Sequence, residues 1–147
     1  MIQLTPIAPS HAPVISALLR LSFPDGWSED AVSSLLELFT TQGWLALDGE
    51  EPVGVILLQL AAGQAEVLTL AVRPERRKLG VAKALLEQAL AHVLQSGAAE
   101  IILDVAVDNA AALALYQSFG FVEVARRKGY YGSGESRTDA VVMKLSL

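Results

Sequence analysis

The sequence predicts an α+β fold, an α/β sandwich in which helices cover a mixed sheet. Two observations support this fold class. Apolar segments of strand length alternate along the chain with longer segments of helical periodicity, and glycine or proline separates them. The composition, 52% hydrophobic and 18% charged, also provides enough apolar side chains for a full core. The order is strand, two helices, three strands, helix, strand, helix, two strands, which gives about seven strands and about four helices.

The first elements are a short strand and two helices. Residues 2–7 have the apolar content of a strand. The helix that follows is expected to run to about Leu21 with Ser10 as its N-terminal cap. Ser28 is expected to cap the second helix in the same way.

The rest of the chain alternates strands with two further helices. Asp48-Gly49 is a hairpin signal between two strands, Gly63 marks the next turn, and Gly97 ends the longest helical pattern. The expected strands are 43–48, 52–60, 66–72, 101–107, 121–126 and 138–147, and the expected helices are 79–95 and 109–118.

Length and composition limit the class of protein. A chain of 147 residues suits one domain, residues 1–147, and the absence of cysteine excludes disulfides, thiolate metal sites and a cysteine nucleophile. No apolar segment approaches the ~20 residues of a membrane helix, and the N-terminus lacks signal-peptide features, so we expect a cytoplasmic protein with no membrane partner. The net charge of −5 disfavours nucleic acid and suits a cationic partner such as an amine. His11 and His92 have no carboxylate in metal-ligand spacing, so no metal is expected.

The segment from Leu68 to Leu86 passes from a strand through a basic turn into a helix. Free N–H groups at a helix N-terminus bind phosphate groups, and the small Gly80 and Ala82 let a pyrophosphate approach the backbone. The spacing is neither that of an ATPase P-loop nor that of the G-x-G-x-x-G dinucleotide motif. A capped helix beside a solvated basic turn would give the same pattern, so the segment alone leaves both interpretations open.

Arg77-x-x-Gly80-x-Ala82 matches the pattern [RQ]-x-x-G-x-[GA], and here the chain resembles the GNAT superfamily of N-acetyltransferases. The resemblance implies a mostly antiparallel sheet, acetyl-CoA as co-substrate and binding of its pyrophosphate to this turn. Its pantetheine arm would pair with the main chain of the preceding strand as an added strand. The implied coenzyme-binding residues are Leu70, Ala71, Val72, Arg77, Lys78, Leu79, Gly80, Val81, Ala82 and Lys83.

A second segment matches the superfamily signature N-x-x-A-x-x-L-Y-x-x-x-G-F without a gap, from Asn109 to Phe121. Tyr116 lies two helical turns after Asn109 and on nearly the same face. The resemblance implies that Tyr116 protonates the departing thiolate and that Asn109 helps to hold pantetheine. Asn109 is also a good helix cap, and a tyrosine on a helix often only packs there.

Asp104 interrupts an otherwise apolar strand, where an unpaired buried carboxylate would be costly. It must therefore face solvent, a partner or a cleft. The chain most resembles the ribosomal-protein-alanine (RimI-like) N-acetyltransferases, which have a glutamate here and use it, through water, to deprotonate the amine. Aspartate is one methylene shorter, so Asp104 is either a relay base or an exposed acid. Glu66 is a weaker candidate for the base.

Three more segments resemble the same branch. Trp27-Ser28-Glu29 resembles its P-W-S-E loop, Arg127 to Tyr131 resembles its R-x-x-Y-Y segment, and Thr138 to Met143 resembles its E-D-A-x-x-M ending. The similarity is nearly continuous from about Ala65 to the C-terminus and loose before it. Tyr130 and Tyr131 either line an acceptor groove or pack as a pair on a loop before the last strand.

Together the motifs predict an enzyme that transfers an acetyl group from acetyl-CoA to an amine. Because there is no cysteine nucleophile, we expect direct attack by the amine in a ternary complex. An α-amine, with a pKa of about 7.7–8.0 against about 10.4 for lysine, needs only a weak base, which favours a protein N-terminus as acceptor. The alternatives are a small-molecule amine, a protein lysine, an idle coenzyme A sensor and a phosphate-binding scaffold.

Overall fold

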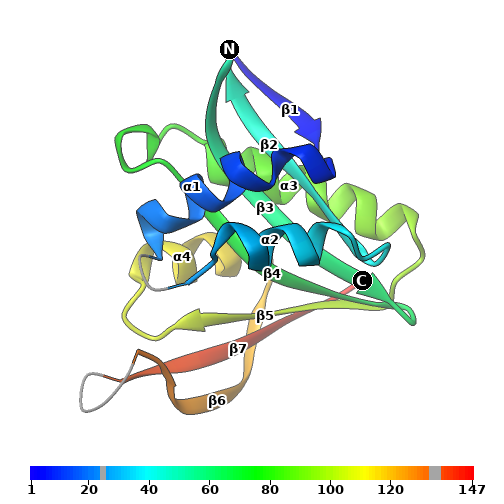
Figure 1. The fold of residues 1–147 in the computed structure, drawn as a ribbon. Coiled ribbons are helices and arrows are strands. Elements are labelled where there is room, and N and C mark those ends of the chain that lie inside the picture. The colour runs from blue at the N-terminus through cyan, green and yellow to red at the C-terminus, as the bar shows by residue number, and fades with distance from the viewer. Residues whose placement is uncertain (24–25, 133–136) are drawn as a thin grey trace.

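A computed structural model describes residues 1–23, 26–132 and 137–147. Its described residues form seven strands, four α-helices and two short 3₁₀ turns at 9–11 and 74–76 (Figure 1). The elements are β1 (Ile2–Pro6), α1 (Ala12–Ser22), α2 (Glu29–Leu36), β2 (Thr41–Asp48), β3 (Glu51–Ala61), β4 (Gln64–Val72), α3 (Val81–Gln95), β5 (Glu100–Ala106), α4 (Ala110–Ser118), β6 (Val122–Tyr131) and β7 (Thr138–Ser146).

All seven strands belong to one sheet with the order β1-β2-β3-β4-β5-β7-β6. Every neighbouring pair is antiparallel except β4 and β5, which are parallel and are joined through α3. The prediction of a mixed, mostly antiparallel sheet flanked by four helices is therefore confirmed.

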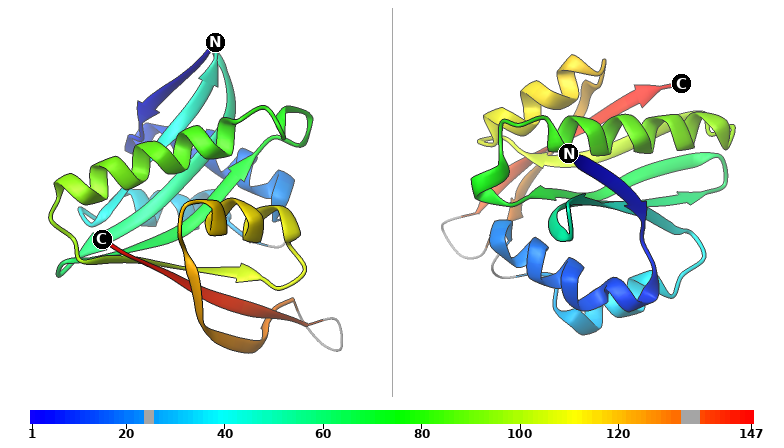
Figure 2. Two further views of the ribbon diagram at one scale, coloured as in Figure 1. Left: turned by 180° about the vertical axis from the view of Figure 1, so that it is seen from behind. Right: turned by 90° about the horizontal axis from the view of Figure 1, so that it is seen from above.

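The helices form a layer on each side of the sheet (Figure 2). The layer of α1 and α2 encloses a core with Ile15, Leu19 and Leu57, which are fully buried. The layer of α3 and α4 encloses a second core on the opposite face, with Leu85, Leu86 and residues of β3, β4 and β5. The two apolar faces account for the near-continuous apolar sequence of β3, which is buried on both sides.

Two of the predicted N-terminal caps have different outcomes. The prediction for Ser28 is confirmed, since its hydroxyl accepts a hydrogen bond from the Ala31 N–H at 3.1 Å. The prediction for Ser10 is wrong, because Ser10 lies within the 3₁₀ turn at 9–11 that precedes α1. The side chain of His11 bonds this turn instead, with Nδ1 accepting from the Ala8 N–H at 3.0 Å.

Most predicted element boundaries differ from the observed ones by one or two residues, and two of the differences have a clear physical reason. α3 begins at Val81 rather than Leu79, because Gly80 and Lys78 have left-handed φ angles of 83° and 64°, which no helix allows. β6 extends to Tyr131, whereas the predicted strand ended at Arg126. This edge strand is exposed over 122–128, so it lacks the buried alternation that identifies a strand in sequence.

None of the helices among the described residues is both long and apolar enough to cross a membrane.

Candidate functional site

The parallel pairing of β4 with β5 stops part-way along both strands. It joins residues 64–67 to residues 100–103, and just beyond it Leu68 forms a bulge opposite β3. From there β4 pairs only with β3, and β5 pairs only with β7. On the side that faces β5, the backbone of residues 70–72 therefore has no strand partner in the described ranges.

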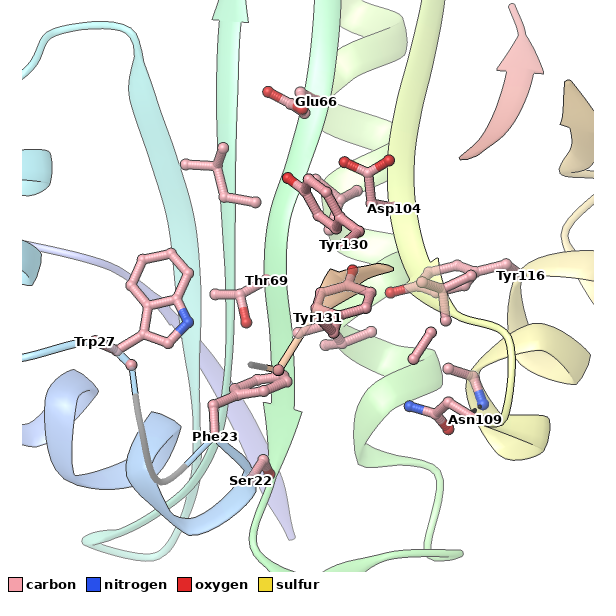
Figure 3. A pocket seen from close by; sticks show the side chains of 18 residues that line it. Ser22, Phe23, Trp27, Glu66, Thr69, Asp104, Asn109, Tyr116, Tyr130 and Tyr131 are labelled. Carbon is pink, nitrogen blue, oxygen red and sulfur yellow. Dashed lines mark hydrogen bonds between the residues drawn. The ribbon is translucent and has the colours of Figure 1, made fainter. Parts of the chain in front are cut away.

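A cleft of about 800 Å³ lies between the separated strands (Figure 3). It is lined from both faces of the sheet: by the end of α1 and the segment after it on one face, and by α4 on the other. The lining side chains used below are Phe23 and Trp27 beside α1 and α2, Glu66 and Thr69 on β4, Asp104 on β5, Asn109 and Tyr116 at α4, and Tyr130 and Tyr131 on β6.

The cleft brings together seven of the residues that the sequence suggested for a site: Glu66, Leu70, Asp104, Asn109, Tyr116, Tyr130 and Tyr131. Ala71, Val72 and the turn of residues 77–83 do not line it. They lie at the end of β4 and the start of α3, next along the chain from the cleft-lining part of β4.

Tyr116 reaches the cleft from the α4 side. Its side chain is 6% exposed and packs edge to face on Phe121, with the ring centroids 5.6 Å apart. Figure 3 shows its hydroxyl pointing into the cleft toward Tyr131. Burial, and secondarily the nearby Tyr131, raises the pKa of Tyr116 well above its usual range, so the hydroxyl keeps its proton at neutral pH.

Asp104 reaches the cleft from the opposite face of the sheet. Its neighbours Leu103 and Val105 point into the core under α3 and α4, so the alternation of a strand turns Asp104 the other way. The side chain is 15% exposed, and Arg127 Nε lies 3.3 Å from its Oδ1. This is an ion-pair distance without hydrogen-bond geometry, and Oδ1 has no hydrogen-bond donor among the described residues.

The tyrosine pair lies on β6, not on a loop as predicted. The rings of Tyr130 and Tyr131 meet edge to face at 4.9 Å, and the Arg127 guanidinium lies 5.2 Å from the centre of the Tyr130 ring. Burial raises the pKa of Tyr131 to about 12, with smaller contributions from the charge of Asp104 and from Tyr130. Both tyrosines line the cleft beside Asp104.

The turn before α3 has the backbone that an anion site needs. Gly80 is the N-terminal cap residue of α3, and no side chain among the described residues bonds to the N–H groups there. The nearby arginines, however, bond within the protein. Arg77 donates to the Ser22 hydroxyl at 3.1 Å and to the Val72 carbonyl at 3.3 Å. Arg76, which belongs to the same basic turn, pairs with Asp48 and Glu51.

Sequence reasoning missed two cleft features. Thr69 is 7% exposed and lines the cleft as the one strongly buried hydroxyl of its strand among the described residues. Trp27 has a left-handed φ of 63°, and the buried Ser16 hydroxyl holds it by donating to the Trp27 carbonyl at 2.7 Å. The signal that identified Asp104, a polar residue inside an apolar strand, applies equally to Thr69.

No three histidine, aspartate or glutamate side chains in the described part of the chain lie close enough to hold a metal ion.

The model of the acetyltransferase (GNAT) family matches residues 12–121. The [ribosomal protein bS18]-alanine N-acetyltransferase of Escherichia coli (strain K12) is 36% identical over 91 residues, which span 62% of this chain and 62% of that protein. The crystal structure of the Escherichia coli ribosomal-protein-S18-alanine N-acetyltransferase superposes with a TM-score of 0.93 at 27% identity, covering 99% of this chain and 94% of that one. The structure of Arabidopsis thaliana NAA60 in complex with acetyl-CoA has a TM-score of 0.89 at 22% identity, covering 100% of this chain and 99% of that one.

The last of these likenesses shows the fold alone, whereas the family model covers most of the chain, including the turn at 77–83, Asp104 and Tyr116. The region matched by the family model thus contains both signature segments. It also contains β4 and β5, the two strands that separate. The chain belongs to the acetyltransferase (GNAT) family.

Proposed function

We propose that this protein is an acetyl-CoA-dependent N-acetyltransferase whose acceptor is the N-terminal α-amine of a protein. The observation that supports it most is the arrangement of the cleft. A tyrosine hydroxyl that burial keeps protonated enters from one face of the sheet, and a carboxylate enters from the other. A proton donor and a proton acceptor on opposite sides of one cleft suit acyl transfer from a thioester to an amine.

The relatives support the class of acceptor. The Escherichia coli protein that matches at 36% identity is named for acetylation of a ribosomal-protein alanine, and the Arabidopsis thaliana structure contains acetyl-CoA. Since the matched segment spans 62% of the Escherichia coli protein, the transfer of its activity to this chain is part of the proposal. We also propose that residues 1–147 form one catalytic domain, because both cores pack on a single sheet.

The coenzyme would lie along the separated strands. The unpaired edge of residues 70–72 offers main-chain groups to pantetheine, and Asn109 lines the same part of the cleft. The pyrophosphate would meet the N–H groups of residues 79–83 at the start of α3, with Lys78 and Lys83 adding charge. Because Arg77 already bonds to Ser22 and Val72, its role would be to hold this turn against α1 and β4.

In the proposed reaction the amine nitrogen forms a bond to the acetyl carbon and the carbon–sulfur bond breaks. Tyr116 gives its proton to the departing thiolate. Asp104 accepts the proton that the amine loses, through a water molecule, because aspartate is short. Arg127, whose Nε lies 3.3 Å from Oδ1, would hold the Asp104 carboxylate in place on the acceptor side of the cleft.

The test is acetylation of two peptides, one with a free N-terminal alanine and one with a blocked α-amine and a free lysine, read by mass spectrometry. We expect acetylation of the free α-amine alone. Acetylation of the lysine peptide would replace the proposed acceptor with a protein lysine. If neither peptide is acetylated while acetyl-CoA still raises the melting temperature, the protein-acceptor proposal is wrong.

A further inference from the structure

The hydroxyl of Thr69 is buried without a hydrogen-bond partner in the described structure. Its strand is otherwise apolar from Val67 to Val72, and valine would fit the same shape without the hydroxyl. Leaving a buried hydroxyl unbonded destabilises the folded protein, because the hydroxyl loses its hydrogen bonds to water and gains none in return. Because this hydroxyl lines the cleft, a bound ligand could supply the missing hydrogen-bond partner, and this would explain why a hydroxyl is present here.

The side of the sheet on which Thr69 lies identifies the ligand. Thr69 pairs with Leu57 of β3, and Leu57 belongs to the core under α1 and α2, so Thr69 also points to that face. Asp104 points to the same face, whereas Tyr116 and the start of α3 lie on the other. Thr69 therefore faces the acceptor side of the cleft and not the coenzyme side.

The surroundings of Thr69 indicate which part of the acceptor it meets. Figure 3 shows Thr69 between Trp27 and Tyr131, with its hydroxyl directed toward Phe23 and away from Asp104. Phe23 has no polar side-chain atom, and the indole N–H of Trp27 makes no hydrogen bond to this hydroxyl. An amine placed by Asp104 carries its own residue's side chain on the adjacent carbon, so that side chain can extend toward Thr69.

We propose that Thr69 selects acceptors whose first residue bears a small hydroxyl side chain, serine above all. This inference rests on the proposed function and refines its acceptor, which would differ from the alanine in the relatives' names by one hydroxyl. A site built to bond a substrate hydroxyl discriminates against the analogue that lacks it, because its own polar group is then left unpaired. An apolar pocket of the same size would not separate serine from alanine in this way.

The experiment compares kcat/KM for two peptides that differ only in an N-terminal serine or alanine, in the wild type and in Thr69→Val. We expect the wild type to prefer serine and the serine-to-alanine ratio to fall about 10-fold in the valine variant, the effect of one lost hydrogen bond. Thr69→Ser keeps the hydroxyl and should keep the ratio. Thr41→Val is the matched control, because Thr41 also has a buried, unbonded hydroxyl but does not line the cleft.

The outcomes separate the inference from the proposed function. If the wild type is active but its serine-to-alanine ratio is the same in Thr69→Val, the proposed role of Thr69 is wrong. This holds even if kcat/KM falls equally for both peptides, because the hydroxyl would then contact a group that both peptides share. A wild type that acetylates no α-amine at all overturns the proposed function itself.

Discussion

At the scale of single residues, burial decides what Tyr116 can do. Because burial raises its pKa, the hydroxyl keeps its proton throughout the physiological pH range but is a weaker acid than a free tyrosine, so we expect its position beside the departing thiolate to matter and not its acidity. We expect Tyr116→Phe to lower turnover by at least ~10²-fold while the Kd for acetyl-CoA changes little. Steady-state kinetics and calorimetric titration measure the two quantities. Unchanged turnover would remove Tyr116 from the mechanism.

Asn109 combines a structural role with a proposed coenzyme contact, and two variants separate them. Its side-chain oxygen accepts a hydrogen bond from the Ala112 N–H at 3.1 Å and so caps α4, while the residue also lines the cleft. Asn109→Asp keeps an oxygen for the cap but loses the amide donors, and it adds a negative charge. We therefore expect Asn109→Asp to keep its stability and bind acetyl-CoA several-fold more weakly, whereas Asn109→Ala should also lose about 1 kcal/mol of unfolding free energy. Full coenzyme affinity in both variants would leave Asn109 as a cap only.

At the scale of elements, the start of α3 needs a glycine at position 80 because of the backbone φ angle there, and not because a side chain would lack room. A Cβ on Gly80 would meet nothing within 4 Å, but its φ of 83° disfavours any L side chain. Gly97, at the other end of the same helix, has a φ of 81° and equally open surroundings. The two positions therefore form a matched pair.

We expect Gly80→Ala and Gly97→Ala to lose similar unfolding free energy, about 1–2 kcal/mol each, in urea titrations. Only Gly80→Ala should weaken acetyl-CoA binding, because a methyl group there stands where the backbone would approach the pyrophosphate. If the two variants bind acetyl-CoA equally well, the pyrophosphate does not bind this turn.

At the scale of the whole molecule, the order of elements could be predicted because each strand and helix has its own periodicity and its own glycine or proline boundary. The separation of β4 from β5 could not be predicted, because it depends on the residue at which the parallel hydrogen-bond ladder stops. Val67 is the last residue of β4 in this ladder, and the next residue, Leu68, is equally apolar in sequence. The extent of β6 was missed for a related reason: an edge strand exposed on both faces has no buried pattern. Asp104 was found by its polarity, while its ion pair with Arg127 across β7 arises only from the strand order.

The stability of the whole protein at alkaline pH should depend on Tyr131. Its pKa is about 12 in the folded protein, against about 10 when unfolded, so between these values the unfolded chain releases a proton that the folded chain keeps. The contribution of Tyr131 to stability is thus fully present below about pH 10 and is lost as the pH rises toward about 12. We expect the unfolding free energy of the wild type to fall more steeply over this range than that of Tyr131→Phe, with urea titrations at several pH values measuring both. The comparison cancels the titration of the lysines, which both proteins share. Parallel curves would mean that Tyr131 ionises as readily in the folded protein as in the unfolded chain, and that the cleft does not shield it from water.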